Sequence, residues 1–250
     1  MNDGHPAIVV GTSGWSYDHW RGPFFPRDLP KTEYLAYYGA RFPGVEINNS
    51  FYQLPAAHTL ENWREKVPDG FVFTAKASRY VTHMKKLKDP GHGLTTFLER
   101  ITVLGDRLGP ILFQLPPHWR FDAARLDAFL EALGSNLPLD RDFEYAFELR
   151  DHSWLNDHTY ELLSRHGAAL CIYDLAGFTS PKEVTADFIY VRLHGPGGPY
   201  RGCYDTATLA GWAGAFHSWA AAGCRVYCFF DNDEAGYAAA NAARLLDMVS

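Results

Sequence analysis

Charged and polar residues end a series of short apolar runs along this 250-residue chain. The runs have the length and the β-branched and aromatic content of strands. There are eight: Ile8–Thr12, Val45–Asn48, Phe71–Lys76, Ile111–Leu115, Glu144–Arg150, Ala169–Asp174, Phe188–His194 and Arg225–Asp231. Side chains two positions apart on a strand share a face, so Glu148 and Arg150 are expected to point the same way. Buried charge without a partner is costly, and these groups must therefore meet one another, water or a ligand.

The residue types in this set suit an anionic ligand. Arg150 and Arg192 can each grip a carboxylate or phosphate with two N–H groups, and Lys76 adds a third cation. Glu148 and His194 are candidates for proton transfer. Lys76 joins them as a predicted catalytic residue because nearby arginines lower the pKa of a lysine. The predicted substrate-binding residues are Arg150, Arg192, Glu46, Asn48, Tyr52, Gln114, Asp174, Asp231, Asn232 and Trp15.

A purely structural explanation of the same charges stays open. The strand ends carry four acidic residues, Glu46, Glu148, Asp174 and Asp231, and three basic ones, Lys76, Arg150 and Arg192. These groups could neutralise one another in an ion-pair network that performs no catalysis.

Segments with the apolar spacing of helices separate most of the runs; they cover Leu94–Leu108, Asp122–Leu133, Thr206–Ala222 and Glu234–Val249. Strands that alternate with helices indicate an α/β fold with a parallel sheet. Eight strands in a chain of this length predict a (β/α)8 TIM-type barrel, with residues 1–250 as a single domain. An irregular connection is expected between the sixth and seventh strands, and an open doubly wound sheet is the alternative fold. In a barrel, the carboxyl ends of the strands converge on one mouth, where such enzymes do their chemistry.

Two long loops and a basic segment are expected near that mouth. Residues Gly14–Pro30 are rich in aromatic residues, and His194–Tyr204 are rich in glycine and proline. Loops of this length are often functional. The segment Lys76–Lys88 is either a solvated basic loop or, with Trp15, Trp20 and Tyr52 as stacking platforms, a contact for nucleic acid.

Composition narrows the function classes. With a net charge of −6, the chain as a whole is not basic, as a nucleic-acid-binding protein commonly is. The sequence shows no signal peptide and no apolar stretch long enough to span a membrane, so we expect a cytoplasmic protein without a membrane partner. The four cysteines form no CxxC pair, HExxH is absent, and the cations of the mouth oppose bound metal. We therefore predict neither a metal nor a cofactor. The oligomeric state stays open.

Several longer motifs resemble the YecE-like family, a domain of unknown function (number seventy-two). They are Gly11-Thr-Ser-Gly-Trp-Ser-Tyr17, Val45-Glu-Ile-Asn-Asn-Ser-Phe-Tyr52, Phe73-Thr-Ala-Lys76, Gly109-Pro-Ile-Leu-Phe-Gln-Leu-Pro-Pro117, Phe147-Glu-Leu-Arg150, Tyr190-Val-Arg-Leu-His-Gly195 and Phe229-Phe-Asp-Asn232. The resemblance spans nearly the whole chain and implies a TIM-barrel-like fold, but it implies no reaction. Where the family often has Asn-Asn, this chain has Asp231-Asn232, which adds a negative charge at the expected mouth.

Three functions follow as hypotheses. The first is a barrel enzyme, a hydrolase, lyase or isomerase, that binds a phosphate- or carboxylate-bearing small molecule and uses acid–base chemistry. The second is a nucleic-acid-binding protein or an endonuclease-like barrel. The third is a barrel that binds a ligand without turning it over.

Overall fold

Eight parallel strands form a nearly closed barrel in the computed structural model, which describes residues 6–135 and 142–250. The parallel strands are β1 (Ile8–Thr12), β2 (Gly44–Ile47), β3 (Val72–Lys76), β4 (Leu108–Gln114), β5 (Tyr145–Glu148), β6 (Ala169–Leu175), β8 (Phe188–Leu193) and β9 (Arg225–Phe230). They pair in the order β1-β9-β8-β6-β5-β4-β3-β2. The predicted TIM-type barrel is confirmed, and the open sheet is wrong.

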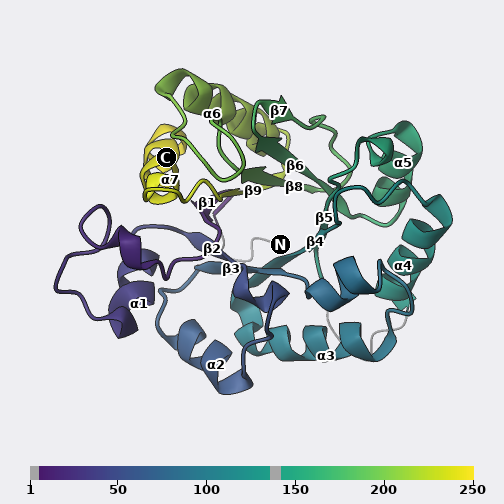
Figure 1. The fold of residues 1–250 in the computed structure, drawn as a ribbon, viewed down its shortest axis with the longest axis horizontal. Helices are drawn as coiled ribbons and strands as arrows, with labels where there is room; N and C mark the ends of the chain where they lie inside the picture. Colours follow the sequence, from purple (N-terminus) through teal and green to yellow (C-terminus); the bar gives the residue numbers. More distant parts are fainter. Residues whose placement is uncertain (1–5, 136–141) are drawn as a thin grey trace.

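Helices lie around the outside of this ring (Figure 1). They are α1 (Tyr34–Gly39), α2 (Ala57–Glu65), α3 (Gly91–Ile101), α4 (Ala123–Ser135), α5 (Asp157–Arg165), α6 (Thr206–Ala221) and α7 (Tyr237–Val249). Short 3₁₀ helices cover Asp18–Trp20, Lys31–Glu33, Asn49–Phe51, Thr102–Arg107 and His152–Trp154, and a π-helix covers Tyr80–Met84. The expected helix over Leu94–Leu108 ends as an α-helix at Ile101 and continues as the 3₁₀ segment to Arg107. None of the helices in the described part of the chain has the length and apolarity to cross a membrane.

The connection between β6 and β8 is irregular, as the sequence predicts. It contains the two-residue strand β7 (Phe178–Thr179), which pairs antiparallel with the end of β6, and no helix. Ala176 and Gly177, which join β6 to β7, both have a positive φ, so the turn is tight.

The barrel interior changes from apolar to polar along its axis. Its apolar part is a separate cluster of ten buried residues: Val9, Val72, Leu112, Ala146, Ala169, Cys171, Phe188, Tyr190, Tyr227 and Phe229. Because inward-facing positions recur every second residue, the next inward residues towards the carboxyl ends include Lys76, Glu148 and Arg192. A second, larger cluster fills the space between strands and helices. The charged groups at the carboxyl ends of the strands therefore lie on top of an apolar layer that fills the rest of the barrel interior.

The seam between β1 and β2 lacks a regular ladder. Ser13 and Glu46 form one isolated parallel bridge there. A Cβ on Gly11 would lie 2.0 Å from the carbonyl oxygen of Gly44, so the two backbones approach each other very closely. The buried hydroxyl of Tyr38 spans the seam, because it accepts from the Thr12 N–H at 2.8 Å and donates to the Gly44 carbonyl at 3.1 Å.

Candidate functional site

Arg192 lies at the centre of the barrel mouth. It is fully buried, and its Nη1 donates to Oε2 of Glu148 at 2.7 Å. Its Nη2 donates to Oε1 of Glu46 at 2.7 Å and to Oδ2 of Asp231 at 3.1 Å. These carboxylates come from β2, from β5 and from the residue that follows β9. One guanidinium therefore ties three parts of the ring together.

Glu46 is held from both sides. Its Oε1 accepts from the hydroxyl of Ser13 at 2.5 Å, and its Oε2 accepts from Tyr190 at 2.8 Å. The Tyr190 oxygen also lies 2.9 Å from the hydroxyl oxygen of Thr74. Since Glu46 is fully buried, these contacts replace the water that a carboxylate loses on burial.

His194 lies between two carboxylates. Its Nδ1 is 3.2 Å from Oδ2 of Asp231, and its Nε2 is 3.2 Å from Oε1 of Glu148. Nη2 of Arg150 is 3.0 Å from the same Nε2, while Nε of Arg150 donates to Glu148. Tyr200 packs its ring edge-to-face on His194 at 5.5 Å. Glu148 and His194 thus meet as predicted, but both are fully buried.

The charges of the network set the protonation of its carboxylates. Burial alone would raise the pKa of Glu148, but Arg150, Arg192 and His194 hold that pKa well below its ordinary value. Burial likewise opposes ionisation of Asp231, and Arg192 and the hydrogen bond from His194 lower its pKa. Both groups therefore stay ionised near neutral pH, as an ion-pair network requires.

Lys76 is the cation of the mouth that lacks an acidic contact. It ends β3 and is 7% exposed, and its Nζ lies 4.4 Å from the centre of the Phe51 ring. Within residues 6–135 and 142–250, no carboxylate lies within ion-pair distance of this Nζ and no side chain accepts a hydrogen bond from it. Burial, then the charge of Arg192, lowers its pKa from 10.5 to about 8, against the opposing carboxylates.

Comparison with known proteins assigns the family. The family described as "Protein of unknown function DUF72" matches residues 9–250. The chain belongs to the DUF72 family. The resemblance to YecE-like proteins is thereby confirmed.

Two curated relatives of this DUF72 chain come from well-known bacteria. The UPF0759 protein YunF of Bacillus subtilis is 29% identical over 161 residues, which make up 62% of this chain and 54% of YunF. The UPF0759 protein YecE of Escherichia coli is 32% identical over 143 residues, 57% of this chain and 48% of YecE. The chain thus spans about half the length of the curated relatives that it matches.

Solved structures of DUF72 proteins share the barrel. A DUF72 family protein from Thermotoga maritima superposes with a TM-score of 0.83 at 30% identity, over 97% of this chain and 98% of that one. A DUF72 family protein from Enterococcus faecalis reaches a TM-score of 0.80 at 20% identity, over 97% and 95% of the two chains. The second likeness shows the fold alone.

Two predicted binding residues of the DUF72 barrel lie beside the network and not in it. Asp174 accepts from Tyr204 at 2.7 Å and from Thr179 at 2.8 Å, and so fixes the β6–β7 hairpin. Asn232 is fully buried, and its amide donates to the carbonyl of Gly202 at 2.8 Å. Both side chains hold loops of the mouth in place, and a ligand contact stays a prediction for each.

The remaining predicted binding residues line two cavities. Trp15, Asn48 and Tyr52 line one of about 580 Å³ beside β2. Gln114 and Arg150 line another of about 370 Å³. Ligand-accessible space therefore lies beside β2 and, separately, at Arg150 of the network.

Some residues of the network and of the cavities were not among the predicted site residues. Tyr190 could have been found from the sequence, because it stands two positions before Arg192 on the same strand face. Trp63 and Lys66 line the larger cavity from α2 and the residue after it, where no strand-end pattern applies. In the part of the chain that the structure describes, no group of three or more His, Cys, Asp or Glu side chains is arranged to hold a metal ion.

Proposed function

We propose that this DUF72 protein is a barrel enzyme that binds a phosphate- or carboxylate-bearing small molecule at the mouth, with Lys76 as the group that exchanges a proton with it. The observation that carries the proposal is the unpaired Lys76 ammonium beside a network in which the other charges have partners. An amine whose pKa is about 8 can give and take protons near neutral pH.

The other predicted residues take different parts in this proposal. Arg150 lines the cavity of about 370 Å³, and its side chain is 9% exposed, so it is the second cation that an anion can reach. Arg192 is fully buried against its carboxylates, and we assign it to positioning. The buried Glu148 and His194 hold Arg150 and set the field around Lys76.

Anion binding is the first test. Sulfate and acetate are titrated into the protein at low salt by calorimetry. We expect saturable heat for the parent protein, a loss of at least about tenfold in affinity for Arg150→Met and for Lys76→Met, and no change for the exposed Arg244→Met. Absence of binding by a folded parent protein contradicts the proposal, and so does equal binding by all four proteins.

Turnover is the second test. A mixture of sugar phosphates and hydroxy acids is incubated with the protein and followed by NMR. We expect one compound to change, and the change to stop in Lys76→Met and to return in part in the same variant when an exogenous amine is added. Binding without any turnover would favour a barrel that only binds its ligand.

One observation favours nucleic acid as a second candidate. Tyr52, Tyr80 and Met84 are 78%, 45% and 70% exposed, and the rings of Phe51 and His83 join their segments at 4.9 Å. These aromatic and apolar groups adjoin the basic residues Lys85, Lys86 and Lys88. Such a surface would bind single strands with a steep salt dependence. Binding of a labelled oligonucleotide at low salt, lost in the triple variant Lys85→Met, Lys86→Met, Lys88→Met, supports this candidate, and no binding removes it.

A further inference from the structure

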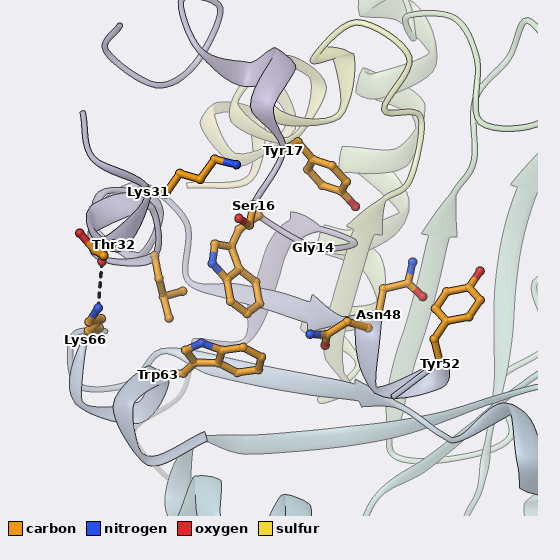
Figure 2. Close-up of a pocket in the computed structure, with 12 residues that line it drawn as sticks. Gly14, Ser16, Tyr17, Lys31, Thr32, Asn48, Tyr52, Trp63 and Lys66 are labelled. Carbon is orange, nitrogen blue, oxygen red and sulfur yellow. Dashed lines mark hydrogen bonds between the residues drawn. The ribbon is translucent and has the colours of Figure 1, made fainter. Parts of the chain in front are cut away.

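The cavity beside β2 has walls of unusual chemistry. Figure 2 shows it with Lys31 and Lys66 on the left, Tyr17 above, Tyr52 on the right and Trp63 below. Trp15 packs against Trp63 with ring centres 4.8 Å apart and planes at 88°. Two perpendicular indoles form a corner and not a parallel pair. Such a corner suits a ligand ring with one apolar face, such as a sugar. A flat nucleic-acid base would instead be stacked between two parallel aromatic rings.

The charged side chains that line this cavity are both lysines. Lys31 is partly compensated, since its Nζ lies 2.6 Å from Oδ1 of Asp18. Nζ of Lys66 donates to the backbone carbonyl of Thr32 at 2.8 Å, shown as a dashed line in Figure 2. Among residues 6–135 and 142–250, no acidic side chain lies within ion-pair distance of Lys66. In a chain with a net charge of −6, this cavity therefore presents a local positive charge.

An unpaired acceptor adds a second requirement. Oδ1 of Asn48 is buried and has no hydrogen-bond partner, and Asn48 lines the cavity. A buried acceptor without a donor costs roughly 1–3 kcal/mol. A phosphate dianion cannot donate a hydrogen bond to Oδ1 of Asn48, whereas a hydroxyl group of a ligand can. The hydroxyl groups of Tyr17 and Tyr52 and the side chain of Asn49 offer further polar contacts on that side.

We propose that this cavity binds a sugar that carries one phosphate or carboxylate group. The anionic group lies at Lys66, the apolar face of the sugar ring packs in the Trp15–Trp63 corner, and a sugar hydroxyl donates to Asn48. The volume of about 580 Å³ accommodates a hexose phosphate. The inference goes beyond the proposed function and does not depend on it, because none of these contacts uses Lys76, Arg150, Glu148 or His194.

Calorimetry with defined probes tests the site. The probes are glucose 6-phosphate, ribose 5-phosphate, glucuronate, glucose, inorganic phosphate and AMP. We expect at least one of the three acidic sugars to bind, and glucose and inorganic phosphate each to bind at least about tenfold more weakly. AMP binding more tightly than every acidic sugar overturns the assignment, as does the failure of all three acidic sugars at about 10 mM.

Substitutions assign the binding to this cavity. Lys66→Met and Trp63→Leu are each expected to weaken the acidic sugar at least about tenfold, and Asn48→Leu to weaken the sugar phosphate while sparing inorganic phosphate. Lys182→Met, an exposed lysine outside the cavity, is the matched control. Urea unfolding shows whether each variant is folded, and Lys66→Met keeps the test open if Trp63→Leu is not. Unchanged affinity in folded Lys66→Met contradicts the inference.

The two proposals fail separately. Arg150→Met and Lys76→Met are expected to leave acidic-sugar binding in the β2 cavity within about twofold of the parent protein. If Arg150→Met and Lys76→Met lose sugar binding while Lys66→Met keeps it, the sugar binds at the network. That result would overturn the assignment to the β2 cavity.

Discussion

Nη1 of Arg192 lies 2.7 Å from Oε2 of Glu148, and both side chains are fully buried in the barrel mouth. The same guanidinium binds Glu46, which is also fully buried. Glu46 therefore has as its ion-pair partner a cation without access to water, and Glu148 shares that cation with Arg150. A buried ion pair adds little net stability, but removal of one partner leaves an uncompensated charge in a place of low dielectric.

Arg192→Met is accordingly expected to destabilise the protein by about 3–5 kcal/mol, measured by urea unfolding. Arg244→Met, on the exposed face of α7, is the control and should change stability by less than about 0.5 kcal/mol. An Arg192→Met variant as stable as the parent protein would show that Glu46 and Glu148 find other compensation.

The pH dependence of anion binding tests Lys76. Its pKa falls from 10.5 to about 8 in the folded chain, mainly through burial. Only the protonated amine attracts an anion, so sulfate affinity should hold below pH 8 and fall about tenfold per pH unit above it. The charge of sulfate itself is constant over this range. Lys76→Arg keeps its charge and should bind sulfate with little change across the same pH values. A parent protein whose affinity is flat between pH 7 and about 10 contradicts a role for Lys76.

The β1–β2 seam makes a prediction about Tyr38. Tyr38→Phe removes the hydroxyl that accepts from Thr12 and donates to Gly44, and leaves a buried N–H and a buried carbonyl without this partner. We expect a loss of about 1–3 kcal/mol in urea unfolding. Tyr37→Phe, one position earlier in α1, is the matched control, and equal stability of the two variants would show that the seam does not need the hydroxyl.

Much of the barrel follows from local pattern. The eight apolar runs and the spacing of residues two apart suffice to place Glu148 and Arg192 on the inward faces of β5 and β8, with Arg150 and His194 just beyond the ends of these strands. They cannot show which charges pair. The pattern suggests Arg192 and Arg150 as a clamp for a ligand, but in the folded chain Nη1 and Nη2 of Arg192 bind Glu148 and Glu46, which come from other strands.

The sequence signal is weakest where a helix or a loop supplies the contact. Asp174 stands at a strand end like Glu148, but the β6–β7 hairpin and Tyr204 engage its side chain. Trp63 lies in α2 on a helix with no marker of function, and only the close approach of Trp15 reveals the corner that the two form.

The order in which the chain is made gives the network one more consequence. Glu46 is separated from Arg192 by 146 positions. While the polypeptide leaves the ribosome, Glu46 and then Glu148 emerge well before the guanidinium that neutralises them. A half-made barrel must keep these carboxylates in water, and the ring can close around its charged centre only after β8 has been synthesised.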